Sequence, residues 1–210
     1  MKAPRNVEPV IRIVDDDQEV RESLKIMLEC EGYLVKAYEN AQDFLKDFDS
    51  RIPGCLLLDV RLPGLSGPEL QQKLLSADKP IEIVFITSYS DIHTAIETLK
   101  AGAVDFLLKP VDPDRLLEVV RKVTVRSRLA GEGVRVPDNL HAELSRLSEQ
   151  PRKVLGFMLE GLNDASISEI MGLSERTVQV YRSNVYKAVG VHSVLQFNLL
   201  APYIRENLNI

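Results

Sequence analysis

Polar and charged side chains come directly after four short apolar segments in the first half of the sequence. Asp15 and Asp16 follow the first segment, Asp59 the third, Thr87 the fourth and Lys109 the fifth. If these segments are strands of one parallel sheet, their carboxyl ends meet at one edge, where ligands of such sheets bind. The spacing therefore predicts a site that combines carboxylates, a hydroxyl and an amine.

These residue types suit phosphoryl transfer. Three carboxylates in one pocket repel one another, and a divalent cation relieves that repulsion. With no His or Cys among them, the oxygen ligands favour Mg2+ over zinc. We expect Asp59 to attack phosphorus as a nucleophile, while Mg2+ and a protonated Lys109 neutralise the phosphoryl oxygens. Thr87 is expected to hydrogen-bond a phosphoryl oxygen.

Some of these residues also have a purely structural interpretation. An aspartate after a strand is commonly a helix cap, and Asp17 and Asp91 both fit that role. A lone Lys-Pro pair is typical of a turn. The coincidence of suitable residues at all four strand ends favours the functional interpretation for the set, and the sequence leaves the role of Asp17 open.

The first half alternates strand and helix patterns, as a doubly wound α/β fold requires. The four apolar residues at 55–58 show no alternation, which is typical of a central parallel strand buried on both faces. The sequence therefore predicts a five-stranded, doubly wound, flavodoxin-like parallel sheet. Its strands are expected at residues 10–14, 33–38, 55–58, 81–86 and 104–108, and its helices at residues 19–31, 41–48, 67–76, 92–101 and 113–126.

Strand patterns are absent from the last third of the sequence, which predicts a small all-α domain. Helical segments are expected at residues 149–159, 166–171, 174–189 and 193–205. A segment with two glycines and a proline, residues 126–138, separates the two halves and predicts a linker. We therefore expect domains at residues 7–126 and 143–210, joined by a linker at residues 127–142.

Within the helical domain, the pattern predicts a helix-turn-helix. Val178, Val185 and Val189 share one face of the second helix and would anchor it, which leaves a polar outer face for contact with DNA. Gln179 and Asn184 could read adenine edges, and Val180 could meet a thymine methyl group. The candidate DNA-binding residues are Arg176, Thr177, Gln179, Val180, Arg182, Ser183, Asn184 and Lys187.

The first half resembles the receiver domains of bacterial response regulators. The resemblance rests on four blocks: Val14-Asp15-Asp16-Asp17, Leu58-Asp59-Val60-Arg61-Leu62-Pro63-Gly64, Ile86-Thr87-Ser88 and Phe106-Leu107-Leu108-Lys109-Pro110. It implies that a sensor histidine kinase phosphorylates Asp59. It also implies that Asp16, Asp59 and the backbone carbonyl of Arg61 ligate Mg2+, with Asp15 acting through water.

The same resemblance implies a conformational switch. Phe106 stands where the family has an aromatic residue that turns inward as Thr87 moves toward the phosphoryl group. The surface built from the fourth helix, fifth strand and fifth helix would then change shape and form a homodimer. Plain core packing of Phe106 is the alternative that the sequence leaves open.

The second half resembles the output domain of LuxR/FixJ-type regulators, through the block from Leu173 to Val185 with Gly161 and Ile167 in register. The resemblance implies promoter DNA as the partner, and dimer contacts from residues 193–205, some of which must instead pack within the domain. Several residues depart from the family, which usually has lysine at positions 179 and 188, histidine at 181 and Asn-Lys-Glu at 164–166. It also usually has Leu-Thr-x-Arg-Glu at 147–151.

These departures dilute the positive charge that binds phosphates, since residues 137–210 contain one more acid than base. Two hypotheses remain: a phosphorylation-controlled transcriptional regulator that binds DNA as a dimer, and a response regulator whose degenerate helix-turn-helix domain binds another protein. Residues 137–210 contain no clustered acid, base or metal-ligand set, so we expect no enzymatic activity from this domain.

Composition is ordinary for a globular protein, with 45% hydrophobic residues and a net charge of −5. No apolar run approaches the roughly 20 residues that span a bilayer, and the N-terminus lacks a secretory signal. We therefore expect a cytoplasmic protein without a membrane partner. Cys30 and Cys55 are expected to be small buried apolar groups and not a disulfide.

Overall fold

A computed structural model describes residues 7–77, 81–137 and 139–208. The chain forms two compact units, Met1–Gly131 and Glu132–Ile210, and each is described by itself. Residues 78–80, 138, 209 and 210 fall within the predicted domains and linker but lie outside the described residues. No helix in the described ranges is both long and apolar enough to cross a membrane.

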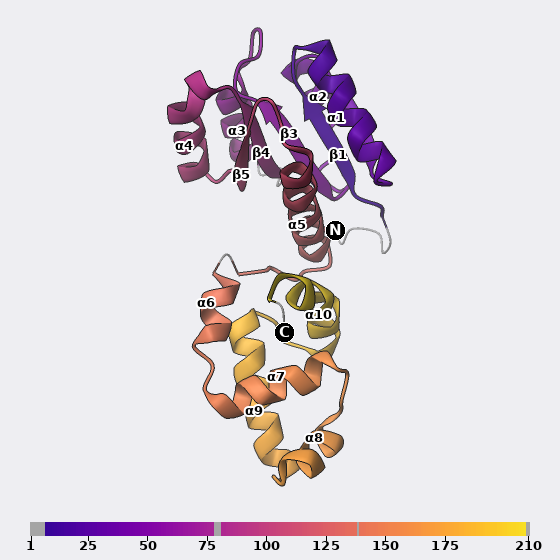
Figure 1. Cartoon of the computed structure of the whole chain (residues 1–210), viewed down its shortest axis with the longest axis vertical. Helices are drawn as coiled ribbons and strands as arrows, with labels where there is room; N and C mark the ends of the chain where they lie inside the picture. The colour runs from indigo at the N-terminus through magenta and orange to yellow at the C-terminus, as the bar shows by residue number, and fades with distance from the viewer. Residues whose placement is uncertain (1–6, 78–80, 138, 209–210) are drawn as a thin grey trace. The chain divides into compact units, whose positions relative to one another are not determined.

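The first unit is a five-stranded parallel sheet with strand order β2-β1-β3-β4-β5, which confirms the predicted doubly wound fold (Figure 1). The strands are β1 (Val10–Val14), β2 (Leu34–Tyr38), β3 (Gly54–Asp59), β4 (Glu82–Thr87) and β5 (Asp105–Leu108). The helices are α1 (Gln18–Cys30), α2 (Ala41–Asp47), α3 (Gly67–Ser76), α4 (Ile92–Lys100) and α5 (Pro113–Gly131), with a short 3-10 helix, η1 (Tyr89–Asp91), before α4.

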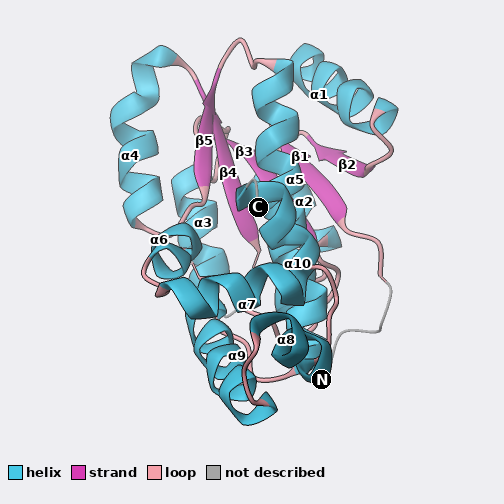
Figure 2. Ribbon diagram, turned by 60° about the horizontal axis from the view of Figure 1, so that its bottom comes forward, coloured by secondary structure: helices cyan, strands magenta, loops and turns pink. Residues whose placement is uncertain are grey.

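Helices cover both faces of the sheet (Figure 2). Side chains of α1 and α5, among them Leu28 and Val120, pack in one core with Ile13 and Leu57 of the strands. Side chains of α2 and α3 pack in a second core on Leu56, Leu58 and Phe85. Because β3 contributes to both cores, all six of its residues are buried, including the four of the apolar run at 55–58, as predicted.

Strand register brings the polar residues to one edge. Val14 at the end of β1 pairs with Leu58, so Asp15 follows beside Asp59. Asp59 pairs with Ile86, so Thr87 follows on the next strand. At the opposite end of β3, a Cβ on Gly54 would lie 1.9 Å from the carbonyl oxygen of Val10, which leaves room for glycine alone.

The last helix of the first unit is longer than predicted. We expected it to end at Arg126, but α5 continues to Gly131, so the beginning of the predicted linker is helical. Leu129 is buried, and Ser127 Oγ accepts a hydrogen bond of 2.9 Å from the backbone N–H of Gly54. The hydrogen bond between Ser127 and Gly54 attaches the start of the additional turn to the sheet.

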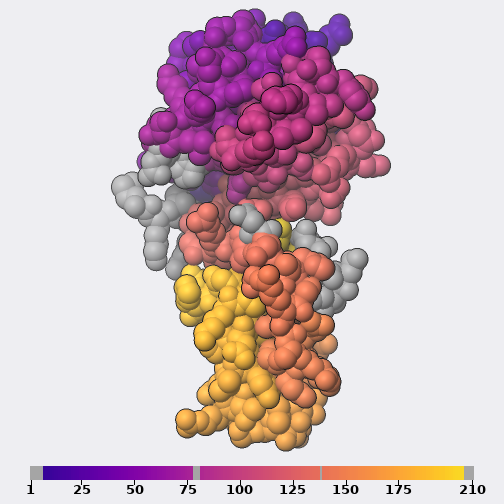
Figure 3. All heavy atoms as spheres, turned by 90° about the vertical axis from the view of Figure 1, so that its left-hand side faces the viewer, coloured from indigo at the N-terminus to yellow at the C-terminus, as the bar shows by residue number. Residues whose placement is uncertain are grey.

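The second unit is all-helical, as predicted, and its atoms form a closely packed cluster, coloured orange to yellow in Figure 3. Its helices are α6 (Leu140–Ser145), α7 (Glu149–Leu159), α8 (Asp164–Met171), α9 (Glu175–Val189) and α10 (Val194–Leu208). We did not predict α6, which lies partly within the expected linker. Its buried side chains, Leu140 and Leu144, attach it to this unit.

The two cysteines differ in exposure. Both are free, as expected, but the prediction that Cys30 is buried was wrong, since it lies exposed at the end of α1. Cys55 is fully buried, and burial raises the pKa of its thiol to about 12.

We expect iodoacetamide to modify Cys30 in the folded protein and to leave Cys55 unmodified, because alkylation requires an accessible thiolate. Mass spectrometry of the native and denatured protein measures this difference. The variant Cys30→Ser provides the control, since it should remain unmodified until it is unfolded. Rapid native labelling of Cys55 would contradict the buried placement of β3.

Candidate functional site

The carboxyl ends of β1 and β3 bring three aspartates together. Asp15, Asp16 and Asp59 each offer an oxygen, and these oxygens lie within 4.8 Å of one another. Asp15 is fully buried and Asp59 is 8% exposed, whereas Asp16 is open to solvent. The predicted convergence of carboxylates is therefore present, with an accessible side.

Lys109, just after β5, lies between two of these carboxylates. Its Nζ is 2.6 Å from Asp59 Oδ2 and 2.7 Å from Asp15 Oδ2. Burial favours the neutral amine, but the close contacts with the carboxylates of Asp15 and Asp59 outweigh it and raise the pKa of Lys109. The amine therefore stays an ammonium ion at neutral pH, as its proposed role requires.

Asp15 is buried, and burial disfavours the charged form of its carboxyl group. Desolvation raises the pKa of Asp15, although contact with Lys109 opposes the shift. Asp15 Oδ1 accepts a hydrogen bond of 3.0 Å from the backbone N–H of Asp17. Asp15 Oδ2 forms an ion pair with Lys109 Nζ, but it has no partner in hydrogen-bonding geometry.

This donor set fits a hard divalent cation. Three carboxylates face one ammonium ion, so negative charge remains in excess. The buried Oδ2 of Asp15 has unused acceptor capacity, and the exposed side of Asp16 leaves room for water ligands. Oxygen donors with space for several waters are typical of Mg2+ sites.

Asp17 has the structural role that the sequence left open. Its carboxylate accepts hydrogen bonds of 2.9 and 3.4 Å from the backbone N–H groups of Glu19 and Val20 at the start of α1. It is therefore the N-cap of this helix.

Arg61, just after β3, is bound to Asp91 at the end of η1. Its backbone N–H donates to Asp59 Oδ1 at 3.1 Å. Its guanidinium donates to Asp91 Oδ1 at 2.6 and 2.9 Å, and Ser88 donates to the other carboxylate oxygen at 2.7 Å. The hydrogen bonds from Arg61 and Ser88 lower the pKa of Asp91. Sequence reasoning missed this pair, because the two residues are thirty positions apart.

Thr87 and Phe106, the two predicted switch residues, lie near the site, but the Thr87 hydroxyl is not hydrogen-bonded to Asp59. Thr87 is fully buried, and its hydroxyl donates to the backbone carbonyl of Ser88 at 3.3 Å. Phe106 is half-buried and packs against the core formed with α2 and α3. This packing agrees with a structural role for Phe106. The movement of Thr87 and the inward turn of Phe106 stay predictions.

The helix-turn-helix has the expected frame. Gly172 ends α8 in the left-handed conformation, and Ser174 caps α9. Val178, Val185 and Val189 are fully buried along one side of α9. Six of the candidate DNA-binding residues are exposed: Arg176, Gln179, Val180, Ser183, Asn184 and Lys187.

The other two candidates are engaged within the domain. Arg182 was expected on the outer face, but its Nη1 lies 2.6 Å from Asp164 Oδ1 and its side chain is 13% exposed. It comes four residues after Val178 and three before Val185, so it shares their side of the helix. Thr177 is half-buried, and its hydroxyl lies 2.9 Å from the capping hydroxyl of Ser174.

Helix α10 divides the residues predicted for a dimer contact. Phe197 and Leu200 are buried, and the Phe197 ring packs against the Tyr186 ring of α9. Val194, Leu195 and Leu199 are 52%, 67% and 37% exposed. The intradomain alternative therefore accounts for Phe197, whereas Val194, Leu195 and Leu199 are accessible.

Two sequence families match the chain. Residues 11–121 match the response regulator receiver domain, and residues 145–201 match the bacterial regulatory proteins of the luxR family. This chain belongs to the LuxR-type response regulators. The three aspartates and Lys109 thus lie in a receiver domain, and α8 and α9 lie in a LuxR-type DNA-binding domain.

Known response regulators are similar over nearly the whole chain. The transcriptional regulatory protein FixJ of Bradyrhizobium diazoefficiens is 34% identical over 91% of this chain and 93% of its own length. The response regulator protein TmoT of Ectopseudomonas mendocina is 35% identical, covering 96% of this chain and 91% of its own.

Solved structures of response regulators support the same assignment. The regulator StyR is 35% identical with a TM-score of 0.56, over 93% of this chain and all of its own. Full-length FixJ from B. japonicum is 31% identical with the same TM-score, over 94% of this chain and 99% of its own. The family assignment and the fold predicted from the sequence are therefore confirmed.

Proposed function

We propose that a sensor histidine kinase phosphorylates this response regulator on Asp59, and that phosphorylation controls binding to promoter DNA. The observation that supports it best is the position of Asp59 at the end of a buried strand, in contact with an ammonium ion and beside two further carboxylates. In the transfer, an Asp59 oxygen forms a bond to phosphorus as the bond from phosphorus to the kinase histidine breaks. The Lys109 ammonium ion balances charge on the phosphoryl oxygens.

The site at the ends of β1 and β3 would hold Mg2+ through Asp16, Asp59 and the backbone carbonyl of Arg61, with Asp15 acting through water. A bound Mg2+ supplies positive charge for the phosphoryl oxygens. The protein's own part is to keep the Asp59 carboxylate positioned, through the backbone N–H of Arg61 and the ammonium ion of Lys109.

Movement of Thr87 and Phe106 would couple phosphorylation of Asp59 to a change in the surface formed by α4, β5 and α5. The Thr87 hydroxyl is bound only weakly to a neighbouring carbonyl at 3.3 Å, so a phosphoryl oxygen is a better acceptor. Its movement would open space for the half-buried Phe106 and favour a homodimer through this surface.

The output domain would bind DNA through the exposed side of α9, namely Arg176, Gln179, Val180, Ser183, Asn184 and Lys187. Thr177 and Arg182 contribute less directly, since both have partners within the domain. The linker would lie within residues 127–142, as predicted from the sequence, after the end of α5 at Gly131 and before the start of α6 at Leu140. A DNA-bound regulator would act in the cytoplasm.

A mobility-shift experiment tests this proposal. Random-sequence duplexes are enriched on the protein with and without the phosphoryl mimic beryllofluoride, and the enriched duplexes are titrated across a salt series. We expect the mimic to strengthen retardation of a selected sequence, and added salt to weaken it. Protein that incorporates phosphate but retards no duplex at the lowest salt would instead support the alternative, a protein-binding output domain. The small excess of acidic over basic residues at 137–210 is the observation that favours that alternative.

A further inference from the structure

One cation of the recognition helix α9 is bound by a carboxylate of its own domain. Arg182 Nη1 lies 2.6 Å from Asp164 Oδ1, and Arg182 Nη2 donates to the Tyr186 hydroxyl at 3.2 Å. The guanidinium also lies over the Tyr186 ring, 5.9 Å from its centre. In the described part of α9, Arg176 and Lys187 are the cations without such an ion pair.

Asp164 is well placed to hold this arginine. It is the first residue of α8, directly after the capping Asn163. The partial positive charge of a helix N-terminus stabilises a carboxylate at this position. Its side chain is 27% exposed, so solvent screens the ion pair only in part.

The ion pair opens onto the surface that we propose for DNA. A hollow of about 710 Å³ is lined by Asp164 and Arg182 together with Gln179 and Ser183 of α9. Gln179 and Ser183 are both exposed and are candidate DNA contacts. A phosphate that approached this side of α9 would therefore meet the Asp164 carboxylate, while the arginine beside it is already neutralised.

We propose that Asp164 limits the affinity of the output domain for DNA by withholding Arg182 from phosphate. This inference rests on the proposed DNA binding. The arginine side chain is long and flexible enough to extend into the hollow once its partner is removed. Asp164 thus acts as a positioning residue and not as a DNA contact.

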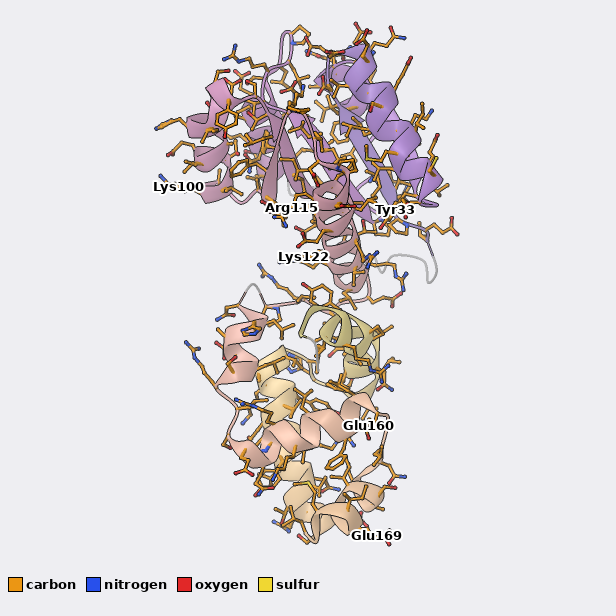
Figure 4. All side chains as sticks on the ribbon, in the orientation of Figure 1. Tyr33, Lys100, Arg115, Lys122, Glu160 and Glu169 are labelled. Atoms are coloured by element: carbon orange, nitrogen blue, oxygen red, sulfur yellow. The ribbon has the colours of Figure 1, made fainter. Side chains whose placement is uncertain are left out.

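The variant Asp164→Asn should bind DNA more tightly and with greater salt dependence. A phosphate contact contributes about 0.9 to the slope of log K against log salt concentration, which corresponds to about eightfold in affinity at 0.1 M salt. Fluorescence anisotropy of the full-length protein with a labelled mixed-sequence duplex measures both quantities. The matched control is Glu169→Gln, which removes one charge from the outside of α8 (Figure 4) and should leave the slope unchanged.

Two further variants make the result decisive. Adding Arg182→Ala to Asp164→Asn should remove the gain in slope, because the new phosphate contact belongs to the arginine. Thermal unfolding establishes that each variant is folded. Asp164→Ser, which keeps a small polar residue at the helix start, replaces the asparagine variant if that one unfolds early.

An Asp164→Asn slope equal to that of wild type or of the Glu169→Gln control overturns the inference. A gain that survives Arg182→Ala also overturns it, because the arginine is then not the group released. If wild type binds and Asp164→Asn binds equally, the proposed function stands and the inference alone fails. If neither protein binds any duplex, DNA binding itself is refuted.

Discussion

The variant Asp59→Asn should incorporate no acid-labile phosphate under conditions in which the wild-type protein is fully labelled. An amide oxygen is a poor nucleophile for phosphorus. Neither Asp15 nor Asp16 could replace Asp59, because only the Asp59 carboxylate contacts both Lys109 Nζ and the backbone N–H of Arg61. Labelling with radioactive acetyl phosphate in the presence of Mg2+ measures the effect. Removal of Mg2+ with EDTA should abolish labelling of the wild type as well.

Asp114→Asn is the matched control for this substitution. It makes the same chemical change at an exposed carboxylate in the first turn of α5, and its labelling should equal that of the wild type. The Lys109–Asp15 ion pair is unaffected by Asp59→Asn, so the variant should remain folded. Full labelling of Asp59→Asn would show that the phosphoryl group is carried elsewhere.

The variant Lys109→Ala should still accept phosphate on Asp59 but lose its effect on output. The nucleophile and the proposed metal ligands remain, whereas the cation that would hold the phosphoryl group in its signalling position is gone. Its removal leaves Asp15 and Asp59 facing each other without a positive charge between them. In the absence of Mg2+ this should lower the free energy of unfolding by about 1–3 kcal/mol, less than for a fully buried pair, because the Lys109 side chain is 24% exposed.

Three measurements separate these effects. Phosphate incorporation, retardation of the enriched duplex and chemical denaturation with and without Mg2+ are compared with those of Lys122→Ala, an exposed lysine on α5 (Figure 4). Added Mg2+ should restore part of the lost stability of Lys109→Ala, since it replaces the missing positive charge. A labelled Lys109→Ala protein that retards DNA as strongly as the labelled wild type would refute the proposed role of Lys109.

The sheet and its polar edge were predictable because they depend on signals that are local in sequence. An apolar run such as residues 55–58 predicts a buried strand, and the rule that ligands bind at the carboxyl ends of parallel strands then locates Asp59. The contact of Lys109 with Asp15 and Asp59 follows from the same topology. These predictions needed only the parallel direction of the strands and no knowledge of side-chain conformation.

Contacts that depend on side-chain conformation or on weak periodicity were not predictable. The pairs Arg61–Asp91 and Arg182–Asp164 join residues far apart in sequence, with nothing in either segment to indicate the partner. Helix α6 is short, and only its packing distinguishes it from a linker. The exposure of Cys30 depends on which side of the last turn of α1 faces the core, and a helix end constrains this poorly.

The ends of β3 determine how the strand is aligned with its neighbours. Its middle is apolar on both faces, so a shift by one residue would still place apolar side chains in both cores. A shift in one direction would bury the Asp59 charge in the place of Leu58 and press a Cys55 side chain against the backbone of Val10. The opposite shift would put Pro53, which has no N–H, where Gly54 donates to Ser127. Asp59, the residue proposed to carry the phosphoryl group, therefore also helps to keep β3 in register. The negative charge that the proposed chemistry requires is the same charge that opposes a shift of the strand.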